Sequence, residues 1–260
     1  MLIRIYLKKE LTMTVSNRSF ATRAGRFNSA CSQLTGVIEY TPSNTLITLP
    51  NLAMFLNDID TKNENVTLSQ QALDDLREAR RHASFINKDE NPVCMESLIK
   101  MVFFYIQADI EDSTGTLKII KHIIDKMEPE SKKALPPVSA ETTDENVSHS
   151  TSERTFAAII DYGKQVLSLI NGIGAGYNPS NDTIKVVNFS ASVTALETLR
   201  TDITTAEQMH NNSITARKNI YDGATGMSAR TVMIKNFLAS LPNKKKNQNY
   251  INFSRTLRGV

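Results

Sequence analysis

Histidine and cysteine side chains are the first candidates for chemistry, because both ligate transition metals. The histidines occur singly, and none lies three or four residues from another histidine or from a cysteine. The cysteines form no Cys-x-x-Cys pair, so we expect reduced, partly buried thiols. The spacing predicts no metal, no cofactor and no catalytic residue. The residues concerned are His82, His122, His149, His210, Cys31 and Cys94.

The glycine-rich stretch Asn171-Gly-Ile-Gly-Ala-Gly176 is a candidate phosphate-binding loop. Such a loop follows a strand and leads directly into a helix, whose amide groups point at the anion. Here a helical pattern precedes the glycines and a proline follows them. We therefore interpret the stretch as the C-terminal cap of a helix.

The C-terminal stretch combines cations with aromatic rings, as nucleic-acid-binding proteins do. Tyr250, Phe253 and Leu257 recur at helical spacing, however, which favours packing of these side chains in a core. Nucleic-acid binding is therefore the alternative to core packing. The candidate basic interaction surface consists of Lys244, Lys245, Lys246, Arg255 and Arg258.

A five-residue motif, Tyr-x-Pro-Ser-Asn, occurs twice, 137 residues apart. Proline disfavours helix at the residue before it, so a preceding helix must end there. Serine and asparagine oxygens can cap the next helix or turn, and the tyrosine ring can pack on a neighbouring helix while its hydroxyl stays in water. We interpret both motifs as structural corners between helices. Their residues are Tyr40, Pro42, Ser43, Asn44, Tyr177, Pro179, Ser180 and Asn181.

The offset of 137 residues relates further positions without a gap. Apolar residues correspond, as Ile59 does to Leu196. The triplet Ala79-Arg80-Arg81 corresponds to Ala216-Arg217-Lys218. Two motifs in one register predict an internal duplication.

Apolar residues recur at three- and four-residue spacing through both halves, which predicts an all-α protein. Two helices are expected to be long, as in an elongated bundle or coiled coil. Asn63, Gln70 and His210 fall on the apolar seam of these helices, where polar residues set register or face water. The long helices are expected at 49–86 and 186–221, and shorter ones at 18–33, 95–108, 115–126, 156–170, 229–241 and 249–257.

The chain is therefore predicted to contain two similar elongated helical-bundle repeats, 14–128 and 154–260, of about four helices each. Residues 129–153 contain three prolines and few large apolar side chains, so they are predicted to be a flexible linker. Residues 1–13 are expected to be a dispensable tail, because Met13 is a second plausible start. With no apolar run near the roughly 18 residues of a membrane helix and no signal peptide, we expect a cytoplasmic protein without membrane contact.

The order of elements resembles that of a group of uncharacterised bacterial tandem-repeat helical proteins. In this order, the corner is followed by a long helix with Ala-Arg late in it, an Asp-Gly break and two short helices. The resemblance implies tandem helical repeats. It implies no established activity and no catalytic or binding residue. The first half departs from the pattern, with Lys88-Asp-Glu-Asn-Pro92 where the second half has Gly223 and Gly226.

Charge divides unequally between the repeats. Residues 14–128 carry 12 Lys or Arg and 15 Asp or Glu, a net charge of −3, and residues 154–260 carry 13 and 6, a net charge of +7. Opposite fields favour contact between the repeats, within one molecule or between copies. Between copies, a heterologous contact closes into rings or extends into filaments.

We therefore expect a non-enzymatic helical scaffold or self-assembling protein, whose partner is another copy or its own other half. Nucleic-acid binding by the basic second half is the alternative hypothesis. An enzyme or metal protein, with ligands converging from several helices, is the third.

Overall fold

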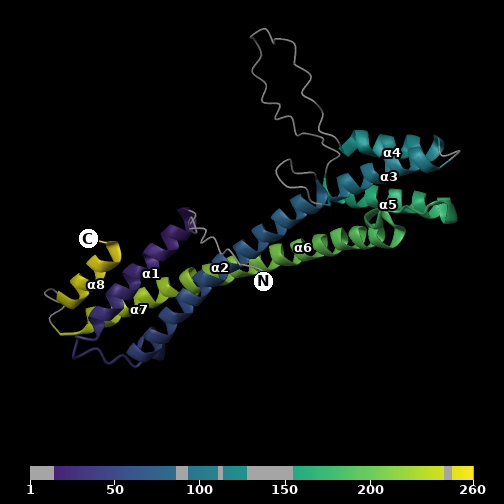
Figure 1. The fold of residues 1–260 in the computed structure, drawn as a ribbon. Helices are drawn as coiled ribbons and strands as arrows, with labels where there is room; N and C mark the ends of the chain where they lie inside the picture. Colours follow the sequence, from purple (N-terminus) through teal and green to yellow (C-terminus); the bar gives the residue numbers. More distant parts are fainter. Residues whose placement is uncertain (1–14, 86–92, 111–113, 128–154, 243–247, 260) are drawn as a thin grey trace, which may run out of the picture. The chain divides into compact units, whose positions relative to one another are not determined.

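The computed structural model describes residues 15–85, 93–110, 114–127, 155–242 and 248–259. These residues form α-helices and short 3-10 helices and contain no strand (Figure 1), which confirms the predicted all-α class. The predicted tail 1–13 and the predicted linker 129–153 lie outside the described residues.

Every predicted helix is present, and each boundary falls within three residues of its predicted position. The 3-10 helices are short and cover 45–47, 174–176 and 182–184. The α-helices are α1 (Val15–Leu34), α2 (Leu49–Ser84), α3 (Met95–Asp109), α4 (Thr114–Met127), α5 (Phe156–Ile173), α6 (Val186–Asp222), α7 (Met227–Ser240) and α8 (Gln248–Arg258).

The helices form two compact units that are not the two sequence halves. Unit 1 combines residues 1–72 with 207–260, and unit 2 consists of residues 73–206. The long helices α2 and α6 each contribute one part to unit 1 and another part to unit 2. Each unit therefore takes helices from both predicted repeats.

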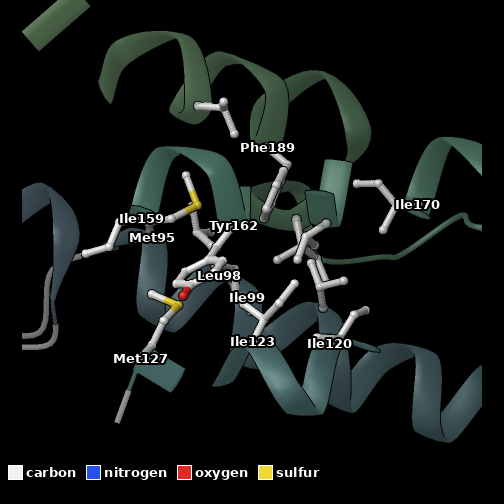
Figure 2. Packing of buried hydrophobic residues seen from close by; sticks show 14 of the residues in the cluster. Met95, Leu98, Ile99, Ile120, Ile123, Met127, Ile159, Tyr162, Ile170 and Phe189 are labelled. Carbon is white, nitrogen blue, oxygen red and sulfur yellow. The ribbon is translucent and has the colours of Figure 1, made fainter. Parts of the chain in front are cut away.

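The core of unit 2 is built from the apolar faces of α3, α4, α5 and the first part of α6 (Figure 2). In α4 the buried residues Ile120, Ile123 and Met127 follow the spacing of one helix face. Helices α3 and α4 precede the predicted linker, whereas α5 and α6 follow it. Buried side chains from both sides of the linker meet in this core; they include Leu98, Ile99, Val166, Ile170 and Phe189.

The core of unit 1 is also built from both ends of the sequence. Its first-half residues include Phe27 on α1 and Leu52 on α2, and its second-half residues include Ile234 on α7 and Phe253 on α8. Helix α8 packs along α1. The core interpretation of the C-terminal apolar stripe holds for Phe253, which is fully buried, and for Leu257, which is partly buried against the core. Tyr250, in contrast, is 36% exposed.

Polar side chains of the long helices pair with each other inside unit 1. The Asn63 amide nitrogen donates to the Tyr221 hydroxyl at 2.9 Å. Ser69 Oγ lies 3.0 Å from His210 Nδ1. Each pair joins α2 to α6, so these polar positions hold two helices together at fixed registers.

The turn between α6 and α7 needs glycine at position 226. A Cβ there would lie 2.8 Å from the carbonyl oxygen of Ile220 and 2.9 Å from that of Asn219. Both atoms are backbone, so Gly226→Ala is expected to lower the free energy of unfolding by about 1–3 kcal/mol. Urea unfolding measures this loss.

Gly25→Ala is the matched control for Gly226→Ala, because nothing lies within 4 Å of a Cβ at position 25 in α1. Alanine in a helix interior is expected to raise stability by about 0.5–1 kcal/mol. Equal effects of the two substitutions would contradict the tight turn.

Candidate functional site

The first tyrosine corner joins α1 to α2 through a buried hydrogen bond. The Tyr40 hydroxyl donates to the carbonyl oxygen of Ile47 at 2.7 Å. The Tyr40 ring packs edge-on against Phe237 of α7, with ring centroids 5.2 Å apart. Asn44 caps the adjoining 3-10 helix, because its Oδ1 accepts from the Leu46 amide at 3.0 Å.

The second corner joins α5 to α6 through the same set of contacts. The Tyr177 hydroxyl donates to the carbonyl oxygen of Ile184 at 2.8 Å. The Tyr177 ring meets Tyr105 of α3 edge-on at 5.3 Å. Asn181 Oδ1 accepts from the Thr183 amide at 3.0 Å and caps its 3-10 helix.

Each corner also contacts a methionine one turn before the aromatic residue on the facing helix. Asn44 Nδ2 lies 3.5 Å from Met233 Sδ, and Asn181 Nδ2 lies 3.9 Å from Met101 Sδ. The facing helix comes from the other half of the sequence in both cases. Each corner therefore contacts a Met-x-x-x-aromatic face on a helix of the other half.

The corner prediction was correct for the asparagines and wrong for the tyrosine hydroxyls. Tyr40 and Tyr177 are each only 6% exposed, and their hydroxyls are satisfied by backbone rather than by water, because the chain turns back and brings a carbonyl seven residues later within reach. Pro42 is half-buried and Pro179 is buried, whereas Ser43 and Ser180 are exposed.

Sequence reasoning found the Ala-Arg triplets but missed their contacts. The Arg217 guanidinium lies over the Phe20 ring at 4.4 Å from the centroid. The Arg80 guanidinium lies over the Phe156 ring at 5.7 Å. Both are cation–π contacts between a long helix and the first helix of the other half. No local sequence signal indicates which aromatic ring each arginine meets.

Burial perturbs the acid–base behaviour of the corner tyrosines. Removal from water raises the pKa of Tyr40 and Tyr177 above the ordinary value of 10.0. Burial also raises the pKa of the Cys31 thiol from 9.0 to about 12. The neutral forms are therefore retained in the folded state at pH values where the unfolded chain ionises.

The raised pKa values predict loss of stability at alkaline pH. The contribution is fully present below the unfolded-state values, 9.0 for Cys31 and 10.0 for the tyrosines, and it is lost as pH rises above them. At one pH unit above the unfolded-state pKa, each buried tyrosine lowers the free energy of unfolding by about 1.4 kcal/mol relative to neutral pH. Urea unfolding between pH 8 and pH 11, roughly the range set by these reference values, measures how steeply the free energy of unfolding falls with pH.

Tyr40→Phe and Tyr177→Phe are the matched variants for this measurement. Each should lower the free energy of unfolding at neutral pH by about 0.5–1.5 kcal/mol, because a buried carbonyl loses its tyrosine donor. The double variant should also show a shallower alkaline slope. An unchanged slope would contradict the assignment to these hydroxyls.

The predicted basic surface is only partly described. Lys244, Lys245 and Lys246 lie outside the described residues, whereas Arg255 and Arg258 are exposed on α8. Arg26 of α1 joins them, because its Nη2 lies 2.5 Å from the point that a Cβ of Gly259 would occupy. Cations are favourable at this position, since a helix C-terminus carries partial negative charge.

The glycine-rich stretch caps a helix, as predicted. Gly174 adopts a φ of 62° and ends α5, and its N–H donates to the carbonyl oxygen of Asn171. Such a positive φ favours glycine, since other residues meet steric strain there.

Among the residues that the structure describes, no group of three or more His, Cys, Asp or Glu side chains is arranged to hold a metal ion. Within the same ranges, no helix has both the length and the apolar character needed to cross a bilayer. Comparisons with protein-family models, with curated proteins and with solved structures found no match to this chain.

Proposed function

We propose that this chain is a non-enzymatic helical scaffold that acts through protein–protein contacts, including contacts with other copies of itself. It is built from two similar repeats, 14–128 and 154–260, joined by the linker 129–153. The observation that carries the proposal is the pair of tyrosine corners, each of which binds a helix from the other repeat.

Equivalent contacts at the two corners support the duplication. The hydroxyl bonds of Tyr40 and Tyr177 reach acceptors 7 residues further along the chain in both cases. The methionine contacts of Asn44 and Asn181 are likewise equivalent. An ancestral unit that was copied would produce this agreement, whereas unrelated helix turns share no such set of partners.

Recognition between repeats supports a role in assembly. Because each corner fits a Met-x-x-x-aromatic face, and both repeats carry that face, a second copy of the chain offers the same binding partners. Proteins with two mutually complementary parts form closed rings or open filaments when the parts meet between molecules.

The two compact units differ more in net charge than the two repeats do, and this difference supports association between copies. Residues 1–72 and 207–260 contain 16 Lys or Arg and 7 Asp or Glu, a net charge of +9, whereas residues 73–206 contain 14 and 20, a net charge of −6. Opposite net charges raise the rate at which chains meet head to tail, and salt screens this attraction.

Light scattering after size-exclusion chromatography tests self-assembly. We expect masses above 29.0 kDa at about 50 mM salt and a lower average mass at about 500 mM. The variant Arg255→Glu/Arg258→Glu should assemble less, and Arg255→Lys/Arg258→Lys, which keeps the charge, should match the parent. A monomer at every salt and protein concentration would refute self-assembly.

The alternative function, nucleic-acid binding, is favoured by one specific observation. Arg26 of α1 lies beside the end of α8, which carries Arg255 and Arg258. Three arginines from opposite ends of the sequence thus gather in unit 1, the basic unit. Arginine binds phosphate oxygens through paired N–H groups.

A gel shift with the full chain and a single-stranded oligonucleotide tests this alternative. Arg255→Gln/Arg258→Gln should weaken binding and reduce the slope of log affinity against log salt by about 2. The Arg→Lys pair should keep the slope. Absence of a shift at low salt would exclude nucleic-acid binding.

A further inference from the structure

The two cores point to a specific partner and to the way in which it binds. We infer that copies of this chain assemble by exchanging halves, so that residues 15–127 of one chain complete both compact units with residues 155–259 of a second copy. This inference rests on the proposed function and names the contact through which self-assembly occurs.

Neither half can bury its own apolar faces in unit 2. Leu98 and Ile99 of α3 are at most 1% exposed, and they share a core with Val166 and Phe189 from beyond the linker. Without α5 and α6, the apolar faces of α3 and α4 would lose this cover. Large apolar patches of that kind drive association with a matching surface.

The same dependence holds in unit 1. Phe27 is fully buried, as is Phe253, and these side chains belong to one core although α1 and α8 stand at opposite ends of the chain. A hydrogen bond from Gln33 Nε2 to Thr256 Oγ1, 2.8 Å long, joins the same two helices. The first half therefore lacks a complete core in both units.

The covalent link between the halves is the segment 128–154, which contains 27 residues. It connects the end of α4 to the start of α5, and both of these ends belong to unit 2. Met127 at the end of α4 and Ile159 near the start of α5 are buried in one core (Figure 2). A second copy presents the same side chains as the chain's own second half. Exchange therefore preserves every contact between the described halves and changes only which molecule supplies them, which is the condition for domain swapping.

Concentration decides between closure within one chain and exchange between two. If the linker behaves as its sequence predicts, it holds the chain's own second half at an effective concentration on the order of millimolar. We therefore expect the intact chain to close on itself in dilute solution and to exchange halves as its concentration approaches that value. Exchange that continues from chain to chain gives larger assemblies than a dimer.

A cleavable linker makes exchanged halves visible. A protease site placed within 129–153 of the full chain leaves the described residues unchanged. Natural-abundance and 15N-labelled chains are mixed, unfolded, refolded together at about 1 mM, and examined by light scattering before and after cleavage. Native mass spectrometry then identifies which halves are paired.

Exchange predicts assemblies heavier than 29.0 kDa that fall to that mass after cleavage. It also predicts complexes of one labelled half with one unlabelled half. The ratio of exchanged pairs to pairs formed within one chain should fall about tenfold when refolding is done at tenfold lower concentration. Chains cleaved separately and then mixed are the control; they should contain fewer mixed pairs than the refolded sample.

Three outcomes would overturn the inference. In the first, assemblies keep their mass after cleavage and contain pairs of one label only. This result would mean that copies dock through their surfaces, so the proposed scaffold would stand and exchange would be refuted. Halves that separate on cleavage refute their mutual dependence. Chains that remain monomeric at all concentrations and salt levels refute exchange and self-assembly together.

Discussion

Replacing Phe189 with alanine is expected to lower the free energy of unfolding by about 3–5 kcal/mol. Phe189 is fully buried at the start of α6, and Figure 2 shows its ring among side chains of α3, α4 and α5. Interiors pack as densely as organic crystals, so the neighbours cannot fill the cavity that the ring leaves. Urea unfolding followed by far-ultraviolet circular dichroism measures the change.

Phe104→Ala is the matched control, because Phe104 lies in the same unit on α3 and is 64% exposed. Its removal should change stability by less than about 0.5 kcal/mol, as for most surface substitutions. A loss below about 1 kcal/mol for Phe189→Ala, or equal losses for both variants, would show that Phe189 does not hold this core together.

Replacing Tyr221 with alanine should cost about 3–5 kcal/mol in unit 1. Tyr221 is fully buried near the end of α6, and its ring packs edge-on against Phe20 of α1 with centroids 4.7 Å apart. Its hydroxyl accepts from Asn63 Nδ2 and donates to the Phe20 carbonyl oxygen, each at 2.9 Å. One side chain thus joins α1, α2 and α6.

Tyr221→Phe separates the hydroxyl from the ring. It should lower the free energy of unfolding by about 1–3 kcal/mol, because the half-buried Asn63 amide loses its acceptor and the Phe20 carbonyl loses its donor. A double-mutant cycle with Asn63→Ala should give a coupling of about 0.5–3 kcal/mol. A coupling energy of zero would mean that the hydrogen bond makes no net contribution to stability. If Tyr221→Phe lowered the free energy of unfolding as much as Tyr221→Ala does, the role of the ring would be contradicted.

Helices were predictable because their signal is local. The spacing of Leu52, Ile59 and Val66 places them on one face of a helix whatever lies opposite, and all three are buried. The asparagine caps were predictable for the same reason: Asn44 bonds to an amide two residues away. Such contacts depend only on nearby sequence.

The partners of these elements were not predictable. Tyr40 meets Phe237 rather than Tyr105, although both aromatic residues follow a methionine by four positions. A sequence that carries the same face twice gives no local reason to prefer either copy. The burial of the corner hydroxyls was missed because the acceptor is a backbone carbonyl, which every residue type provides.

The sequence by itself determined the all-α class, the positions of the helices and the two capped corners, because hydrophobic period, proline and asparagine act over a few residues. Only the tertiary structure decided that each core joins helices from both ends of the chain. Apolar burial is not directional, so which of two similar faces covers a helix is settled by the fit of whole helices rather than by any single motif.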